Sequence, residues 1–152
     1  AIATGAEIAG ASRSMIETTH DYGLQLGMAF QIMDDAMDYN VASGAMGKNS
    51  GDDFLDQKIT LPMILAYADS SKQERDFWHR TMRDGDFVDG DFDKALDILQ
   101  KYNAIERSID EAVNYATAAE ATVQLISGWS SADPNLIEAL SETARFAAHR
   151  QA

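Results

Sequence analysis

Three aspartates within five positions, Asp34, Asp35 and Asp38, are the residues of this sequence best suited to chemistry. They occur in FQIMDDAMDY, where most neighbouring residues are apolar or helix-forming. In a helix, Asp34 and Asp38 lie one turn apart on one face, with Asp35 beside them. Two carboxylates about 5 Å apart repel by roughly 3 kcal/mol at an effective dielectric near 20. A divalent cation would relieve that repulsion, and oxygen ligands without nearby His or Cys favour Mg²⁺ that keeps some waters and binds a substrate phosphate.

The helix that must carry these aspartates is predicted to be apolar on two sides. Its apolar arcs comprise Leu26, Phe30, Met33 and Met37 on one side and Ala29, Ile32 and Ala36 on the other. Between the arcs runs a strip roughly 120° wide that holds Gly23, Gly27, Gln31, Asp34, Asp35 and Asp38. A helix of this kind belongs in a core, so the strip is predicted to face a cleft. The alternative is an ordinary solvated helix face, which the apolar neighbours disfavour.

A glycine-rich segment follows the aspartates and contains cations. Helical periodicity stops from Asn40 to Thr60, and a connection longer than about 12 to 15 residues is more often functional or disordered than a simple spacer. Lys48 and Lys58 in this segment are two of only 12 Lys and Arg residues, and Asp53 lies between them. Glycines let backbone N–H groups approach an anion, and lysines contribute positive charge. Together with the aspartates, the segment indicates a metal-diphosphate site.

The elements that must position these residues are predicted to be helices. Two prolines and strong use of Ala, Leu, Ile and Met favour helix over strand. We expect an uncapped helix at the start and a long one from Ser12 or Ser14 to about Tyr39. Later helices are expected from Pro62, after the SKQE capping box at 71–74, and over DFDKALDILQKY, IERSIDEAVNYATAAEATVQLI and PNLIEALSETARFAAHR. The sequence shows no repeat or internal boundary, which predicts a single all-α domain over residues 1–152.

Composition excludes several function classes. A formal net charge of −13 argues against nucleic-acid binding, because a phosphate-binding surface needs clustered Lys and Arg. The sequence has no cysteine, which excludes disulfides and thiolate zinc sites and is compatible with the cytoplasm. No apolar run approaches roughly 18 residues, so no transmembrane segment is expected, and no signal-peptide pattern opens the chain.

The combination GMAFQIMDDAMDY and GKNSGDDFLDQKITLP resembles the second aspartate-rich region of the trans-isoprenyl diphosphate synthases, the polyprenyl synthetase family. The shared order is Phe-Gln, Asp-Asp-x-x-Asp-Tyr, Gly-Lys, Asp and Lys-x-Thr-Leu-Pro. The GDDF and ITLP segments, with ERDFW downstream, are most similar to octaprenyl and decaprenyl diphosphate synthases, which make quinone side chains. The resemblance covers nearly the whole chain and implies the C-terminal half of the isoprenoid synthase helical bundle.

The resemblance also implies a reaction and a role for eight residues. The reaction is the Mg²⁺-dependent head-to-tail condensation of isopentenyl diphosphate with an allylic prenyl diphosphate. The implied metal-binding residues are Asp34, as the principal Mg²⁺ ligand, with Asp35 and Asp38, and with Asp53 in the outer shell. The implied substrate-binding residues are Phe30, Gln31, Lys48 and Lys58. Asp34, Asp35, Asp38 and Lys48 are the implied catalytic set.

Other features limit what this chain is expected to do. The family's other aspartate-rich motif does not occur in this sequence, so we expect weak binding of Mg²⁺ and diphosphate and no prenyl transfer by the chain alone. Exposed apolar helix faces would then favour a homo-oligomer. A non-catalytic subunit of a heteromeric prenyl synthase and an α-helical interaction module remain alternatives. The cluster DGDFVDGDFD resembles an EF-hand loop but has Val88 and Ala95 at ligand positions, which predicts a solvated turn.

Overall fold

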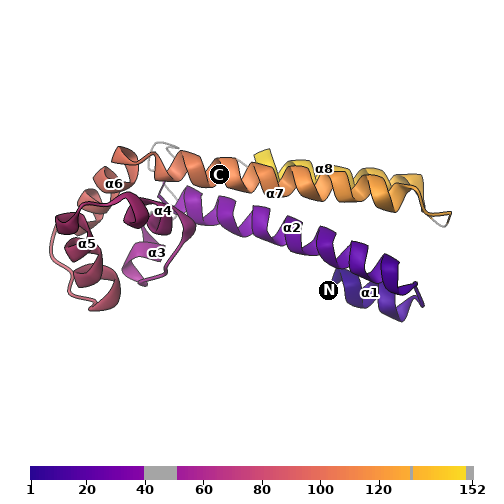
Figure 1. The fold of residues 1–152 in the computed structure, drawn as a ribbon, viewed down its shortest axis with the longest axis horizontal. Coiled ribbons are helices and arrows are strands. Elements are labelled where there is room, and N and C mark those ends of the chain that lie inside the picture. Colours follow the sequence, from indigo (N-terminus) through magenta and orange to yellow (C-terminus); the bar gives the residue numbers. More distant parts are fainter. Residues whose placement is uncertain (40–50, 131, 150–152) are drawn as a thin grey trace. The chain divides into compact units, whose positions relative to one another are not determined.

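The computed structural model describes residues 1–39, 51–130 and 132–149, and in these residues it contains helices and no strand (Figure 1). The elements are α1 (Ile2–Ile8), α2 (Arg13–Asp38), α3 (Asp52–Leu55), α4 (Leu61–Asp69), α5 (Lys72–Trp78), the π-helix η2 (His79–Arg83), α6 (Asp91–Lys101), α7 (Ala104–Ser127) and α8 (Pro134–His149). The predicted all-α fold is therefore confirmed. Across the described ranges, no helix is long and apolar enough to cross a membrane.

The chain forms two compact units, each with its own core. Among the described residues, the first contains 1–31 and those of 111–149, and the second contains those of 32–110. The long helices α2 and α7 each contribute residues to both units. Both divisions fall inside uninterrupted helical periodicity, so the sequence does not mark them.

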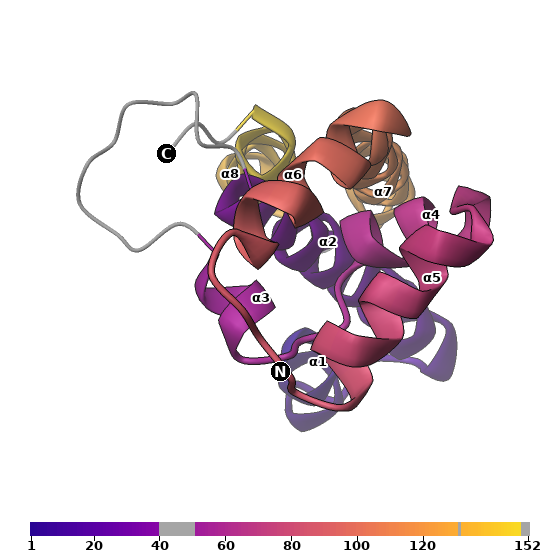
Figure 2. The same cartoon turned by 90° about the vertical axis from the view of Figure 1, so that its left-hand side faces the viewer.

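In the first unit, α2, α7 and α8 run alongside one another (Figures 1 and 2). Their shared core contains Tyr22, Ala119, Val123, Ile126 and Ala144. The Tyr22 hydroxyl donates a hydrogen bond of 2.9 Å to the backbone oxygen of Leu140. A second link joins α2 to α7, because the Thr122 hydroxyl donates to Gln25 Oε1 at 2.8 Å. These partly buried polar contacts fix which faces of the three helices meet.

In the second unit, the short helices α3, α4, α5 and α6 are arranged around an aromatic core (Figure 2). Tyr39, Phe54, Phe77 and Trp78 are all nearly fully buried there. Phe54 meets the edge of Trp78 with ring centroids 6.5 Å apart. Tyr39 and Phe54 directly follow Asp38 and Asp53 in the sequence, so this core lies next to the predicted site.

Side-chain hydrogen bonds cap three helix starts, and the capping box predicted at 71–74 is confirmed. Ser12 accepts a hydrogen bond from the Met15 N–H at 3.4 Å, ahead of α2. Ser71 and Glu74 form a complete capping box at α5. Before α8, Asp133 Oδ1 accepts from the Asn135 N–H at 2.8 Å. Local side-chain chemistry therefore sets these boundaries.

The acidic cluster DGDFVDGDFD is a solvated turn only in part. Asp84, Asp86 and Asp89 are exposed, as predicted, but Asp91 is buried. Asp91 accepts two hydrogen bonds from Arg80, of 2.6 and 2.9 Å, and one of 2.8 Å from the Val88 N–H. The prediction is wrong for Asp91 because Phe87 and Phe92 pack against the core, so the start of α6 is buried with them.

Candidate functional site

The three aspartates of the predicted metal site end helix α2. Asp34, Asp35 and Asp38 are each partly buried, and the last turn of the helix contains no basic residue. The C-terminal end of a helix carries partial negative charge, so each carboxylate there is destabilising by about 0.3–1 kcal/mol. Selection for stability alone would favour Lys or Arg at these positions. The arrangement therefore puts negative charge at the negative end of the helix dipole, where binding of a cation is favourable.

After residues 40–50 the chain returns to the end of this helix. The Gly51 N–H donates to the backbone oxygen of Asp38 at 3.1 Å. The Asp53 N–H donates to Asp38 Oδ2, also at 3.1 Å. Two hydrogen bonds thus hold the start of α3 against Asp38. Lys48, which was predicted to contact a diphosphate, lies outside the described residues.

Asp53 also forms an ion pair with Lys58. Lys58 Nζ lies 2.6 Å from Asp53 Oδ1 and 3.6 Å from Asp56 Oδ2. The Lys58 backbone N–H also donates to the Asp53 backbone oxygen at 2.9 Å. The hydrogen bond and charge of Asp53 raise the pKa of Lys58, so the ammonium stays charged at neutral pH. Its side chain is 56% exposed, which leaves it accessible to an anion.

Electrostatics around Asp38 favour a cation. Burial raises the pKa of Asp38, and the charges of Asp53 and Asp52 raise it further, while hydrogen bonds from the Asp53 and Gly51 N–H groups oppose the rise. Burial also raises the pKa of Tyr39 to about 12, with smaller contributions from nearby aspartates. Negative charge is thus disfavoured here unless a positive charge compensates it.

The second unit brings together Asp38, Asp53 and Lys58 from the predicted set, and Asp34 and Asp35 lie on the turn of α2 that leads to Asp38. Phe30 and Gln31 precede them in α2 but belong to the first unit. Phe30 is 41% exposed, so the predicted apolar arc is wrong at this position, although Met33 on the same arc is buried. An exposed aromatic side chain is compatible with contact to a ligand or another protein surface.

The donor atoms fit a magnesium ion that shares its ligands with a substrate. Within the described part of the chain, no three His, Asp or Glu side chains lie close enough to hold a metal ion by themselves. Mg²⁺ is usually bound through one or two carboxylates, with waters and substrate phosphates completing an octahedron. Asp34, Asp35 and Asp38 supply only oxygen donors, which suits that open type of site and not a closed zinc site.

Gly51 has a packing role that the sequence did not reveal. Its φ is 91°, in the left-handed region, and a Cβ atom would lie 2.5 Å from Phe92 Cε2. Its N–H donates to Asp38, so in this structure the group serves the protein's own helix end. The recurring glycines predicted that backbone N–H groups in this segment approach an anion. The contact between Gly51 and Phe92 could not be predicted from residue spacing, because the two residues are far apart in the sequence.

Comparisons with known proteins converge on one family. Residues 1–99 match the family model described as polyprenyl synthetase. A decaprenyl diphosphate synthase from Rhodobacter capsulatus superposes with a TM-score of 0.84 at 34% identity, over 97% of this chain and 44% of that one. A polyprenyl synthase from Caulobacter crescentus, complexed with calcium and isoprenyl diphosphate, gives a TM-score of 0.79 at 39% identity, over 99% of this chain and 44% of that one.

Sequence similarity alone leads to the same family. The octaprenyl diphosphate synthase of Haemophilus influenzae is 29% identical over 119 residues, which cover 78% of this chain and 36% of that protein. This chain thus spans less than half the length of these relatives. Their activities belong to proteins that are more than twice as long as this chain.

Proposed function

Because the chain belongs to the polyprenyl synthetase family, we propose that it provides the second metal-diphosphate half-site of a long-chain polyprenyl diphosphate synthase. The observation that supports the proposal is the return of Gly51 and Asp53 to Asp38, together with the ion pair between Asp53 and Lys58. The names of the octaprenyl and decaprenyl relatives support a long product, and with it a role in quinone side-chain synthesis.

Each site residue has a distinct proposed task. Asp34, Asp35 and Asp38 bind the metal through carboxylate oxygens, and Asp53 holds Asp38 and Lys58 in place from the outer shell. Lys58 and Lys48 contact the diphosphate, while Phe30 and Gln31 contact the substrate beside it. When bound, Mg²⁺ supplies positive charge that stabilises the departing diphosphate.

The proposed substrates are an allylic prenyl diphosphate and isopentenyl diphosphate. The Caulobacter relative is complexed with calcium and isoprenyl diphosphate, which supports binding of a divalent cation and a prenyl diphosphate by this chain. Lys58 can exchange its contact with Asp53 for a diphosphate oxygen, because both are anionic oxygen acceptors. The chain spans less than half the length of these relatives, so we expect the chain alone to bind diphosphate without transferring a prenyl group.

Calorimetry with Mg²⁺ and inorganic diphosphate tests the proposal. We expect heat when both are present and loss of that heat in the Asp34→Ala variant. Asp21→Ala is the matched control, since Asp21 is an exposed aspartate on the same helix, with a 64% exposed side chain. A chain that gives no heat, or that loses equal heat in both variants, would instead support an interaction module whose acids are surface charge.

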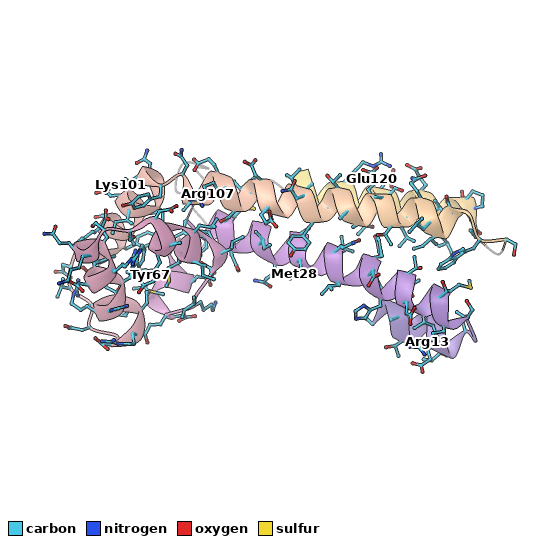
Figure 3. All side chains as sticks on the ribbon, in the orientation of Figure 1. Arg13, Met28, Tyr67, Lys101, Arg107 and Glu120 are labelled. Atoms are coloured by element: carbon cyan, nitrogen blue, oxygen red, sulfur yellow. The ribbon has the colours of Figure 1, made fainter. Side chains whose placement is uncertain are left out.

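A protein contact is proposed for the apolar side of α2 in the first unit. Leu24 is 56% exposed and Met28 37%, although both are large and apolar. Figure 3 shows Met28 on α2, and Leu24 lies one turn before it. Exposed apolar groups at this spacing favour association, and we propose a second copy of the chain as the partner. Sedimentation velocity over a concentration series should show self-association that Met28→Ser weakens; a monomer at all concentrations would contradict it.

A further inference from the structure

Helix α6 contains none of the motifs of the predicted site. One of its residues, Phe92, nevertheless packs against Gly51, where the chain returns to Asp38. A Cβ atom on Gly51 would lie 2.5, 2.6 and 2.9 Å from three atoms of the Phe92 ring. Real Cβ atoms do not approach so closely, and the φ of 91° further disfavours any other residue. The ring and the glycine backbone therefore form a contact that leaves no room for a side chain.

The same ring contacts the residues that follow both carboxylates. Phe92 stacks on Tyr39 with centroids 6.5 Å apart, and Tyr39 immediately follows Asp38. It also lies 5.8 Å from the ring of Phe54, which immediately follows Asp53. One side chain thus touches the chain directly after Asp38, at Gly51, and directly after Asp53.

The backbone of Phe92 is itself anchored. Its neighbour Asp91 is buried and accepts hydrogen bonds of 2.6 and 2.9 Å from the two terminal nitrogens of Arg80. The Val88 N–H adds a third, of 2.8 Å, to the same carboxylate. Arg80 also donates to the backbone oxygen of Asp86. A paired guanidinium and carboxylate fix direction as well as distance, so the start of α6 is held firmly.

We propose that Phe92 is a positioning residue for the metal-diphosphate site. Its ring packs against Gly51, Tyr39 and Phe54. This packing keeps the Asp53 N–H hydrogen-bonded to Asp38 Oδ2 and so fixes the orientation of that carboxylate. The proposal rests on the proposed function, because it assigns Phe92 to the same site. It places a determinant of metal affinity on a helix that the aspartate and lysine motifs do not include.

Two matched variants test this, Phe92→Leu and Phe87→Leu. Phe87 belongs to the same aromatic core and lies 5.3 Å from Phe54. The first measurement is amide hydrogen exchange by NMR without metal. In Phe92→Leu we expect the Gly51 and Asp53 amides to exchange at least about tenfold faster than in Phe87→Leu, compared at equal global stability. Equal exchange in the two variants would overturn the positioning role.

The second measurement is calorimetry with Mg²⁺ and inorganic diphosphate. Loss of a group that orients metal ligands commonly weakens metal affinity about 10- to 100-fold, so we expect that loss in Phe92→Leu and unchanged affinity in Phe87→Leu. If the unmodified chain binds and Phe92→Leu binds equally well, the inference is wrong and the proposed function stands. If the unmodified chain gives no heat while Gly51 and Asp53 still respond to Phe92→Leu, the proposed function fails and the positioning of Asp38 by Phe92 stands.

Discussion

Replacing Asp38 by Asn should stabilise the metal-free chain. Asn keeps an oxygen that can accept the hydrogen bond from the Asp53 N–H, which is 3.1 Å long, and removes only the charge. The charge lies at the C-terminal end of α2, where it is destabilising by about 0.3–1 kcal/mol. It also lies one turn from Asp34, and such a like-charge pair is destabilising by about 0.2–0.5 kcal/mol. Asp38→Asn should therefore raise the free energy of unfolding by about 0.5–1.5 kcal/mol at neutral pH.

The pH dependence of this effect has a definite sign. Because burial raises the pKa of Asp38 in the folded chain, the neutral acid is favoured on folding. Its destabilising effect is complete above the raised pKa and disappears as the pH falls below the ordinary value of 3.8. The advantage of Asp38→Asn should thus be largest at neutral pH and shrink in acid.

Urea unfolding followed by circular dichroism, at low salt and without metal, measures the effect. Asp93→Asn is a control of opposite sign, since Asp93 is exposed in the first turn of α6. A carboxylate there faces the positive end of a helix, so its loss should lower the unfolding free energy by about 0.3–1 kcal/mol.

Mg²⁺ with diphosphate should reverse the order of stability between the unmodified chain and Asp38→Asn. A ligand at 100 times its dissociation constant adds about 2.7 kcal/mol to the stability of a protein that binds it only when folded. A less stable Asp38→Asn without metal, or equal gains from Mg²⁺ and diphosphate in both proteins, would refute the electrostatic reasoning.

Three further predictions concern Gly51, Lys58 and Tyr22. Gly51→Ala should lower the free energy of unfolding by about 1–3 kcal/mol because of its left-handed backbone, and a lower melting temperature in thermal unfolding would show it; unchanged stability would contradict the contact with Phe92. Lys58→Gln should weaken diphosphate binding in calorimetry while leaving the melting temperature nearly unchanged, because the Lys58 side chain is 56% exposed; unchanged binding would remove Lys58 from the site. Tyr22→Phe should cost about 1 kcal/mol in urea unfolding through loss of the hydrogen bond to Leu140, and a more stable variant would show that the bond contributes nothing.

Local patterns were sufficient to predict most helices. The long helix expected from Ser12 or Ser14 to about Tyr39 is Arg13–Asp38, and the helix expected from Pro62 is Leu61–Asp69. Caps and periodicity involve residues within a few positions of each other, so a single sequence contains them. The short helix α3 and the π-helix η2 were not predicted, because contacts with the aromatic core shape both segments.

The chemical groups of the site could be predicted from the sequence, but the contacts that hold them in place could not. The spacing of the aspartates and the glycine-rich segment led to the family, which the comparisons confirm. The pairing of Asp53 with Asp38, and the contact between Gly51 and Phe92, join residues far apart in the chain. Such contacts depend on how the chain folds back on itself, and neither composition nor periodicity records them.

The most direct test of the account is an NMR titration of the unmodified chain with Mg²⁺ in the presence of inorganic diphosphate. We expect saturable shifts at the amides of Asp34, Asp35, Gly51 and Asp53 that require both Mg²⁺ and diphosphate. Shifts confined to exposed acids such as Asp93, or no saturable shift at all, would contradict the metal-diphosphate site at the end of α2.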